Sequence, residues 1–580
     1  MILLSGSAFQ PLLNPVSHSA ALSALVAASP LVVLFVLLGV VRWKAHRAAL
    51  AALACAMAVA CIGFEMPLGT AADSVLVGAA FGLFPIMWIV VNAIWIYNMT
   101  VATGHFDALR RSMGSISPDL RVQAVVIAFC FGGLLEALAG FGTPVAITAA
   151  MLIAVGMQPL KAASAALVAN TAPVAFGAMA SPITTLAALT HLPVHDVSMM
   201  VGRQTPLLAL IVPLLLVAIV DGTRGLRQAW LPAIVVGVVF AVAQFGASNY
   251  LSAQLTDVVA SLAGTAALVL LLRVWRPTTM VAAKSATDDK NAANEELQFQ
   301  VERAALLAHE VEAGGARRSV SLAAHPASAQ DTGSRASDTV RAYAPYAVII
   351  AVFSLAQIPA VKQLLAKATV TFAWPGLHVL TATGAPASST TFRFDWLASA
   401  GSLLLLCGLV VVPVLGLEPR AALRAYGHTV RQLRVAILTV ACVLGLAYLM
   451  NLSGQTTAIG HWLAGAGRAF AFLSPVLGWL GVAVTGSDTS ANALFGSMQV
   501  AAATDAGLPP LLLAAANSSG GVIGKMISPQ NLAIAAAVTG LHGREGDLLR
   551  KVIGWGVGLL LALCVLVFLQ SNSALGWMVP

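Results

Sequence analysis

Long apolar runs recur along the whole sequence and constrain its fold more than any other feature. Runs long enough to cross a bilayer, about 20 residues each, fall near residues 22–41, 48–69, 75–97, 122–139, 160–181, 204–221, 229–247, 253–272, 342–363, 395–416, 435–451, 508–526 and 552–570. Shorter or broken apolar pieces lie at 143–157, 472–503 and 529–541. Inside a bilayer a helix satisfies its own backbone hydrogen bonds. The pattern therefore predicts an all-α polytopic membrane protein with about 12 to 14 transmembrane helices.

Composition supports this class and argues against others. Hydrophobic residues make up 59% of the chain and charged residues only 9%, whereas soluble domains carry about 25% charged residues. The net charge of +8 does not indicate nucleic-acid binding, because the basic residues lie in short loops between apolar runs. All six cysteines lie inside apolar runs without metal-type spacing, so we expect no disulfide framework, metal or cofactor.

Basic clusters between the apolar runs predict the orientation. By the positive-inside rule, we expect the following groups on the cytoplasmic side: Arg42, Lys44 and Arg47; Arg110, Arg111 and Arg121; Arg224 and Arg227; Arg420, Arg424, Arg431 and Arg434; Arg544, Arg550 and Lys551. The N-terminus then lies outside.

A charged segment divides the chain into two transmembrane halves, residues 1–272 and 342–580. Residues 277–340 hold 6 Lys or Arg and 9 Asp or Glu, and Ala, Ser, Glu and Asp dominate there. We interpret residues 273–341 as a mostly disordered cytoplasmic linker, with a possible helix at 292–312 and no part in transport. Residues 364–394 are predicted to form a shorter outer loop.

Polar residues concentrate at 486–530, in otherwise apolar surroundings. Asp488, Asn517 and Lys525 stand there. A charge at the centre of a membrane helix costs about 2.5 to 3.5 kcal/mol on insertion scales, so it is by default a functional-site hypothesis. Three glycines and a proline at 520–529 disfavour an uninterrupted helix, and broken backbone at membrane depth lines a cavity or is buried in protein.

A similar segment occurs in the first half. NTAPVAFGAMASP at 170–182 aligns without gaps on NSSGGVIGKMISP at 517–529, with five of thirteen positions identical. Paired, interrupted apolar segments in two halves indicate the binding site of a secondary transporter. We expect two repeat-related halves with broken or re-entrant helices. Hydropathy does not decide whether the repeat is inverted or parallel.

Two carboxyl groups are candidates for proton coupling. Glu136 lies inside an apolar run, where a carboxyl can bind and release a proton. The alternative is a carboxyl that bonds only to a neighbouring helix. Asp488, flanked by Ser487 and Thr489, could bind a proton or a cation, or could cap a half-helix.

Lys525 is the candidate partner for a substrate carboxylate. With the site empty, either Asp488 or Glu136 would pair with it; the alternative is a lysine that extends to the headgroups. Further donors are Asn170, Thr171, Asn517, Ser518 and Ser519, although such groups also join helices to one another.

Four segments resemble the signature segments of the lactate permease family. They are FGGLLEALAGFGTPVAI at 131–147, NTAPVAFGA at 170–178, SPVLGWLGVAVTGSDTSANALFG at 474–496 and NSSGGVIGKMISPQ at 517–530. The resemblance, which spans most of the chain, implies proton-coupled uptake of L-lactate, D-lactate and glycolate across a bacterial inner membrane. No nucleophile with its base is evident in the sequence, so we expect no enzymatic activity. The resemblance adds Gly142 and Thr143 to the candidate substrate-binding residues. Members usually read Glu-Gly-Ala-Ala-Gly-Phe-Gly where this chain has EALAGFG at 136–142, which predicts a bulkier pocket beside Glu136.

Other readings are weaker. SGGVIGKM lacks the glycine that a phosphate-binding loop needs at Ser519 and the Ser or Thr that it needs at Met526. His191, His195 and Asp196 have no further metal ligands nearby in sequence. Transport of another organic anion, sodium coupling and a passive channel remain alternatives, and a channel would need the cavity but no proton-binding carboxylate. The sequence does not indicate an oligomeric state.

Overall fold

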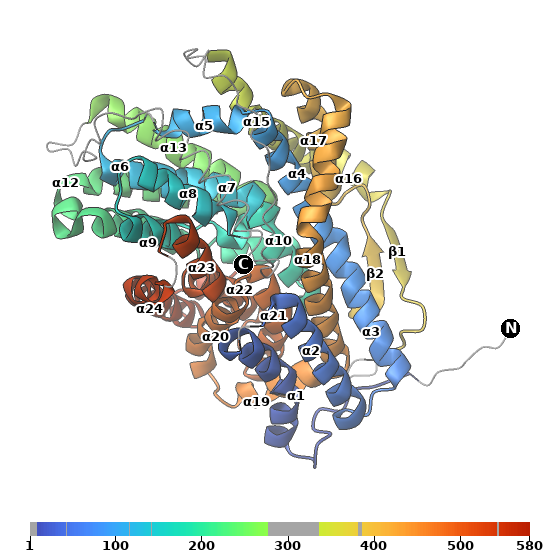
Figure 1. Ribbon diagram of the computed structural model, residues 1–580. Coiled ribbons are helices and arrows are strands. Elements are labelled where there is room, and N and C mark those ends of the chain that lie inside the picture. The colour runs from blue at the N-terminus through green and yellow to red at the C-terminus, as the bar shows by residue number, and fades with distance from the viewer. Residues whose placement is uncertain are drawn as a thin grey trace.

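The computed structural model describes residues 8–41, 43–114, 116–140, 142–275, 336–380, 386–541 and 544–580, and these residues are almost entirely helical (Figure 1). Most of the predicted linker, including the possible helix at 292–312, lies outside the described residues. The second half begins earlier than expected, because its first helix starts at Ala336 rather than near residue 342.

The first half contains two groups of helices. The first group is α1 (Ala20–Phe35), α2 (Ala45–Ala58), α3 (Leu68–Phe81), α4 (Trp88–Ala102) and α5 (His105–Gly114). The second is α6 (Leu120–Gln123), continued by π-helical turns to α7 (Gly132–Ala139), then α8 (Thr143–Ala154), α9 (Pro159–Ala169), α10 (Gly177–Thr190), α11 (Val194–Val201), α12 (Pro206–Tyr250) and α13 (Thr256–Val274).

The second half also has two parts. The first contains α15 (Ala336–Gln357), α16 (Pro359–Ala366), the strands β1 (Val370–Ala373) and β2 (Thr391–Phe394), and α17 (Ala400–Val414). The second contains α18 (Pro419–Leu452), α19 (Gln455–Ala464), α20 (Ala469–Thr485), α21 (Asp488–Asp505), α22 (Pro510–Gly524), α23 (Pro529–Val538) and α24 (Glu545–Gln570). In Figure 1, α22 lies between the α6–α13 group and the α19–α21 group.

Local sequence signals explain where many of these helices begin. A proline stands at the first turn of α9, α12, α18, α22 and α23, where its missing N–H leaves no hydrogen bond unmade. Ser487 and Ser528 cap α21 and α23 by accepting hydrogen bonds from backbone N–H groups. These caps fix the starts of two helices next to the site described below.

The outer loop predicted at 364–394 contains structure that the sequence did not indicate. β1 and β2 pair antiparallel, with Val370 opposite Phe394. This two-stranded sheet lies at the margin of the molecule (Figure 1). These eight residues are a small addition to a helical body, and the all-α prediction is confirmed.

The number of spanning helices also differs from the 12 to 14 expected. Among the described residues, nine helical stretches are long and apolar enough to span a bilayer, or ten if the bent pair α9 and α10 is one span. One counted stretch contains α12, which bends at Gly222 so that Gly237 packs against the backbone of Leu210. Three helices of intermediate length, α8, α17 and α20, fall short of the length required.

Two helical hairpins and two broken helices meet inside the molecule. The α7–α8 hairpin turns at Gly142 and the α20–α21 hairpin turns at Gly486, with φ values of +83° and +74° that favour glycine. The α9–α10 pair bends by 60°, and residues 525–528 separate α22 from α23. Helix α10 contacts both α7 and α21, and α22 contacts α21. The broken backbone is thereby buried in protein.

Arg121, expected among cytoplasmic loop charges, is fully buried instead. Its guanidinium pairs with Asp119 at 2.7 Å and with Asp221 of α12 at 3.2 Å. Lys161 at the start of α9 donates a hydrogen bond to the carbonyl of Val220. Both interactions, one from α6 and one from α9, join this segment of the chain to the bend of α12.

Candidate functional site

A cavity of about 440 Å³ lies where the hairpins and broken helices meet. Its wall includes Glu136 from α7, Asp488 from the start of α21 and Lys525 from the break after α22. Three of the predicted site residues, distant in sequence, therefore share one space. Ligand cavities commonly measure about 300 to 1,000 Å³, so a small organic acid fits easily.

Lys525 and Glu136 form a buried ion pair on this wall. The Lys525 Nζ lies 2.6 Å from Glu136 Oε1, and the two side chains are 6% and 3% exposed. Asn170 donates a hydrogen bond of 2.8 Å to Glu136 Oε2. Gly177 faces the same carboxyl, and a Cβ there would collide with it. Of the two partners predicted for Lys525, it is Glu136 that forms an ion pair with it in the structure.

Asp488 is held differently. Its Oδ2 accepts hydrogen bonds from the Ser518 hydroxyl at 2.6 Å and the Asn492 amide at 3.3 Å. Its Oδ1 lies next to Gly521, where a Cβ would collide with it. This carboxyl therefore has neutral donors as its direct partners in the described part of the chain.

The other predicted substrate-binding residues are buried away from the cavity wall. The Asn517 amide donates to Asn492 at 2.9 Å and its oxygen accepts from Gln499 at 3.4 Å. The Thr171 hydroxyl donates to the carbonyl of Val168 in the preceding turn.

Gly142, Thr143 and Ser519 are also absent from the cavity wall. A Cβ at Gly142 would meet Ile534 of α23, which makes this glycine a packing position in the present conformation. Ser519 is fully buried.

One wall of the site consists of contacts between α10 and α21 that sequence reasoning missed. The hydroxyls of Ser181 and Thr489 lie 3.3 Å apart, and the Asn492 amide donates to the carbonyl of Pro182 at 3.3 Å. Toward the far ends of the two helices, Ser497 donates to the carbonyl of Leu189 at 2.8 Å. Thr489, Asn492 and Ser497 follow one another at intervals of three and five residues along α21, and this spacing of polar residues was the available sequence signal.

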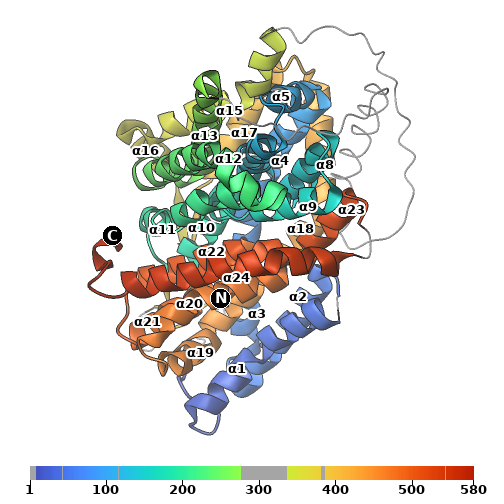
Figure 2. The same cartoon turned by 90° about the vertical axis from the view of Figure 1, so that its left-hand side faces the viewer.

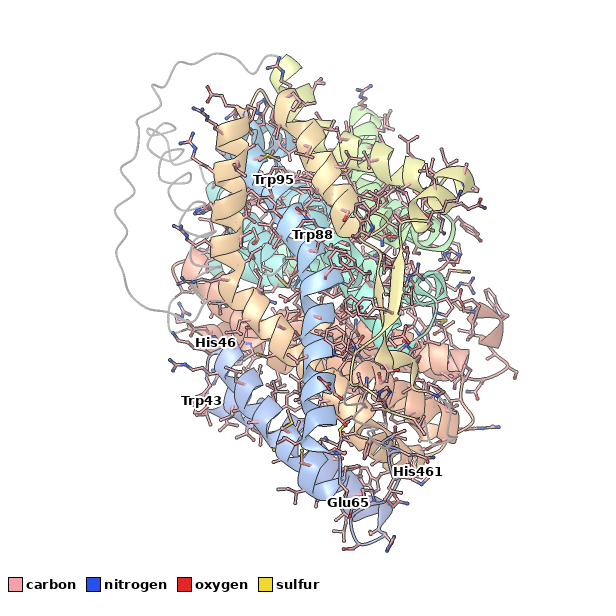
Figure 3. The ribbon with its side chains drawn as sticks, turned by 90° about the vertical axis from the view of Figure 1, so that its right-hand side faces the viewer. Trp43, His46, Glu65, Trp88, Trp95 and His461 are labelled. Carbon is pink, nitrogen blue, oxygen red and sulfur yellow. The ribbon has the colours of Figure 1, made fainter. Side chains whose placement is uncertain are left out.

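The cavity continues to the turn between α1 and α2. Trp43 and Lys44 line it there, and Trp43 is 47% exposed. Figure 3 shows Trp43 at the margin of the molecule, and Glu65, between α2 and α3, at the bottom of the view. Since Lys44 belongs to a predicted cytoplasmic basic cluster, the mouth of the cavity corresponds to the expected inner side.

The two aligned segments differ in local structure. Asn170 ends α9 and directly precedes the break, whereas Asn517 lies within α22, eight residues before the break at Lys525. Ser528 caps α23, whereas Ser181 lies within α10. The shared feature is an interrupted helix, and the repeat itself stays a prediction.

No group of three or more metal-ligating side chains occurs in the part of the chain that the structure describes. His191, at the end of α10, lies 2.7 Å from the Ser389 hydroxyl. The pKa of His191 is lowered, because surrounding protein removes part of the hydration of its charged form although the residue stays exposed.

Comparison with known proteins decides the family. The L-lactate permease family model matches residues 23–573.

The chain belongs to the L-lactate permease family.

Among its relatives, the L-lactate permease of Bacillus subtilis is 39% identical over 98% of this chain and 99% of the relative. The L-lactate permease and the glycolate permease GlcA of Escherichia coli K12 are each 38% identical, over 96% of this chain and 97% of each relative. Among solved structures, the YdaH transporter of Alcanivorax borkumensis is a weak match, with 14% identity, a TM-score of 0.39, and coverage of 83% of this chain and 84% of that one.

Family membership and the apolar helices together define the class of protein. It is a multi-pass transporter of a bacterial inner membrane, and not an enzyme. The structure places Glu136, Asp488 and Lys525 around one cavity.

Proposed function

We propose that this protein is a secondary active transporter that takes up L-lactate, and the related 2-hydroxy acids D-lactate and glycolate, together with protons. Relatives named L-lactate permease and glycolate permease, similar over nearly the full chain, support this substrate class. The cavity wall holds a buried lysine, Lys525, that can bind a carboxylate, and two carboxyl groups, Glu136 and Asp488, that can bind protons.

The ion pair between Lys525 and Glu136 carries this proposal. A substrate carboxylate that binds Lys525 must displace Glu136, which would leave two buried anions beside one cation. Removing one partner from a buried ion pair costs about 3–5 kcal/mol. Protonation of Glu136 removes this cost, so lactate and a proton bind together.

Asn170 supports the exchange without taking part in charge transfer. Its amide donates to Glu136 Oε2 at 2.8 Å, and it can keep this bond to either form of the carboxyl. Glu136 therefore stays in place when it leaves Lys525, and it can return to the lysine after the substrate departs.

The present conformation corresponds to a site open toward the inside. The cavity reaches the surface near Trp43 and Lys44, and contacts between α10 and α21 lie on the other side of it, from Ser181–Thr489 to Leu189–Ser497. Opening toward the outside requires these two helices to separate. Such alternating exposure of a fixed site is how secondary transporters work.

Uptake of labelled L-lactate into proteoliposomes tests the function. We expect accumulation above the external concentration when the pH is lower outside, and equilibration only when the pH gradient is dissipated. Accumulation that requires a sodium gradient would show a different coupling ion. A flux that never exceeds equilibrium under any ion gradient would indicate a channel.

A further inference from the structure

A third acidic side chain, Asp257, is buried close to the site without lining the cavity. It lies in the first turn of α13 and is fully buried. Its carboxyl is close enough to Glu136 and Lys525 to interact with both electrostatically. Neither of its oxygens accepts a well-formed hydrogen bond from the described residues, although the Gln244 side chain lies beside it. A carboxyl this poorly satisfied at membrane depth demands an explanation.

Helix packing brings Asp257 to the level of Glu136. A Cβ at Gly133 of α7 would collide with the Ser261 hydroxyl of α13, and one at Gly264 would contact the Cys130 thiol. These two pairs show that α13 runs antiparallel to the helical segment formed by α7 and the π-helical turns before it. Asp257, one turn before Ser261, therefore lies opposite the turn after Gly133, which carries Glu136.

Polar side chains continue from Asp257 away from the cavity. Gln244 accepts a hydrogen bond from Thr205 at 3.3 Å. Gln204, the residue that precedes Thr205, donates a hydrogen bond to Gln570 at the end of α24 at 3.1 Å. All four of these side chains are buried. Buried polar side chains of this kind can hydrogen-bond water.

This row of polar side chains ends on the side opposite the cavity mouth. Arg203 bonds to Asn249 at 3.0 Å and to the carbonyl of Met578 near the C-terminus at 2.8 Å. Tyr250, next to Asn249, is 78% exposed. In Figure 2, α24 crosses the molecule from the side of α2 and α23 to the C-terminus at its other end. The row thus leads toward the expected outer face.

We propose that Asp257 carries the coupled proton between the outer face and Glu136. This step deepens the proposed function and rests on it. A proton from outside water binds the Asp257 carboxylate; the new O–H bond then breaks as one forms on Glu136, and Glu136 releases Lys525 to the substrate. The charged or titratable groups near Asp257 are Glu136 and Lys525. The Cys130 thiol, which precedes α7, faces Gly264, two turns after Asp257 on α13.

The isosteric variant Asp257→Asn separates proton movement from lactate movement. In proteoliposomes, we expect pH-driven lactate uptake and the accompanying proton flux to fall by about 100-fold, the scale of a lost proton-transfer group. Lactate-for-lactate exchange needs no net proton movement and should stay within about twofold of wild type. The matched control Ser261→Ala, one turn along the same helix, should retain both activities.

Two further outcomes keep the proposal open to refutation. If Asp257→Asn does not reach the membrane, Asp257→Glu replaces it, and this variant should change the dependence of uptake on external pH without changing the dependence on internal pH. Normal proton-coupled uptake by Asp257→Asn, or an unchanged external pH dependence in Asp257→Glu, would overturn the role of Asp257. If wild type moves lactate without protons, the proposed function itself fails instead.

Discussion

The two cavity carboxyls that were predicted as proton-coupling groups occupy contrasting surroundings. Glu136 pairs with a cation, Lys525 Nζ, at 2.6 Å. Asp488 accepts hydrogen bonds from the neutral donors Ser518 and Asn492. Both are almost fully buried, so burial does not distinguish them. The difference lies in what an arriving anion can displace.

An anionic substrate directly changes the surroundings of Glu136 but not those of Asp488. It can take the place of Glu136 on Lys525, whereas hydroxyl and amide donors on Asp488 can serve an ionised or a protonated carboxyl equally. We therefore assign coupling to Glu136, and expect Asp488 chiefly to fix the start of α21 on the cavity wall. The following variants test that division, from the largest expected effect to the smallest.

Lys525→Gln should have the largest effect. It removes the cation that binds the substrate and leaves Glu136 unpaired, a type of change that costs about 2–5 kcal/mol, or roughly 30- to several-thousand-fold in affinity. The half-saturating lactate concentration should rise accordingly. Lys525→Arg should restore only part of the affinity, because a planar guanidinium does not replace a compact ammonium. Unchanged affinity in a correctly inserted Gln variant would contradict the assignment.

Glu136→Gln should abolish coupling but preserve binding. The neutral amide mimics the protonated carboxyl, so Lys525 stays available to lactate at every pH. We expect no accumulation under a pH gradient and exchange within about tenfold of wild type. Concentrative uptake by this variant in proteoliposomes would be incompatible with the role of Glu136.

Asp488→Asn should have a smaller effect. An amide oxygen can still accept one hydrogen bond from Ser518, so we expect a loss of about tenfold or less in transport rate with coupling intact. The ratio of proton to lactate flux measures this outcome. If Asp488→Asn lost coupling while Glu136→Gln kept it, the roles of the two carboxyls would have to be exchanged.

Two glycine substitutions should give the smallest and most specific effects. Gly177→Ala places a methyl group against Glu136, and Gly521→Ala places one against Asp488; overpacking of this kind costs about 1–3 kcal/mol. Gly177→Ala should weaken lactate binding, whereas Gly521→Ala should mainly lower the melting temperature. Gly546→Ala is the control, since no atom lies within 4 Å of its added Cβ. Equal effects on binding from both variants would argue against the contrast.

The sequence predicted the charged centre of the site but not its pairing. A charge in an apolar segment is costly unless it is paired, so Lys525 needed an acidic partner. Few acidic residues lie in the apolar segments, and Glu136 and Asp488 were the two obvious candidates. The choice between Glu136 and Asp488 depends on how α7 and α22 pack, which local sequence does not encode. Asp257 went unnoticed because it stands near the start of an apolar run, although its spacing of four residues from Ser261 indicates a polar face.

The helical body was predictable because apolar length and glycine or proline breaks are local signals. The hydrogen-bond partners of the predicted substrate-binding residues were not predictable. Asn517 and Thr171 are the residue types that bind carboxylates, yet they bond to Asn492 and to the carbonyl of Val168, and such helix-joining contacts look the same in sequence. The β1–β2 sheet was missed because its strands are only four residues long each.

Proton uptake on lactate binding tests the central claim most directly. Calorimetric titration of the purified protein with L-lactate, repeated in buffers of different ionisation enthalpy, gives the number of protons bound per lactate. If lactate displaces Glu136 from Lys525, wild type should take up about one proton per lactate above neutral pH and Glu136→Gln should bind lactate with none. Wild type that binds lactate without taking up a proton, or Glu136→Gln that takes up as many as wild type, would contradict the exchange at Lys525.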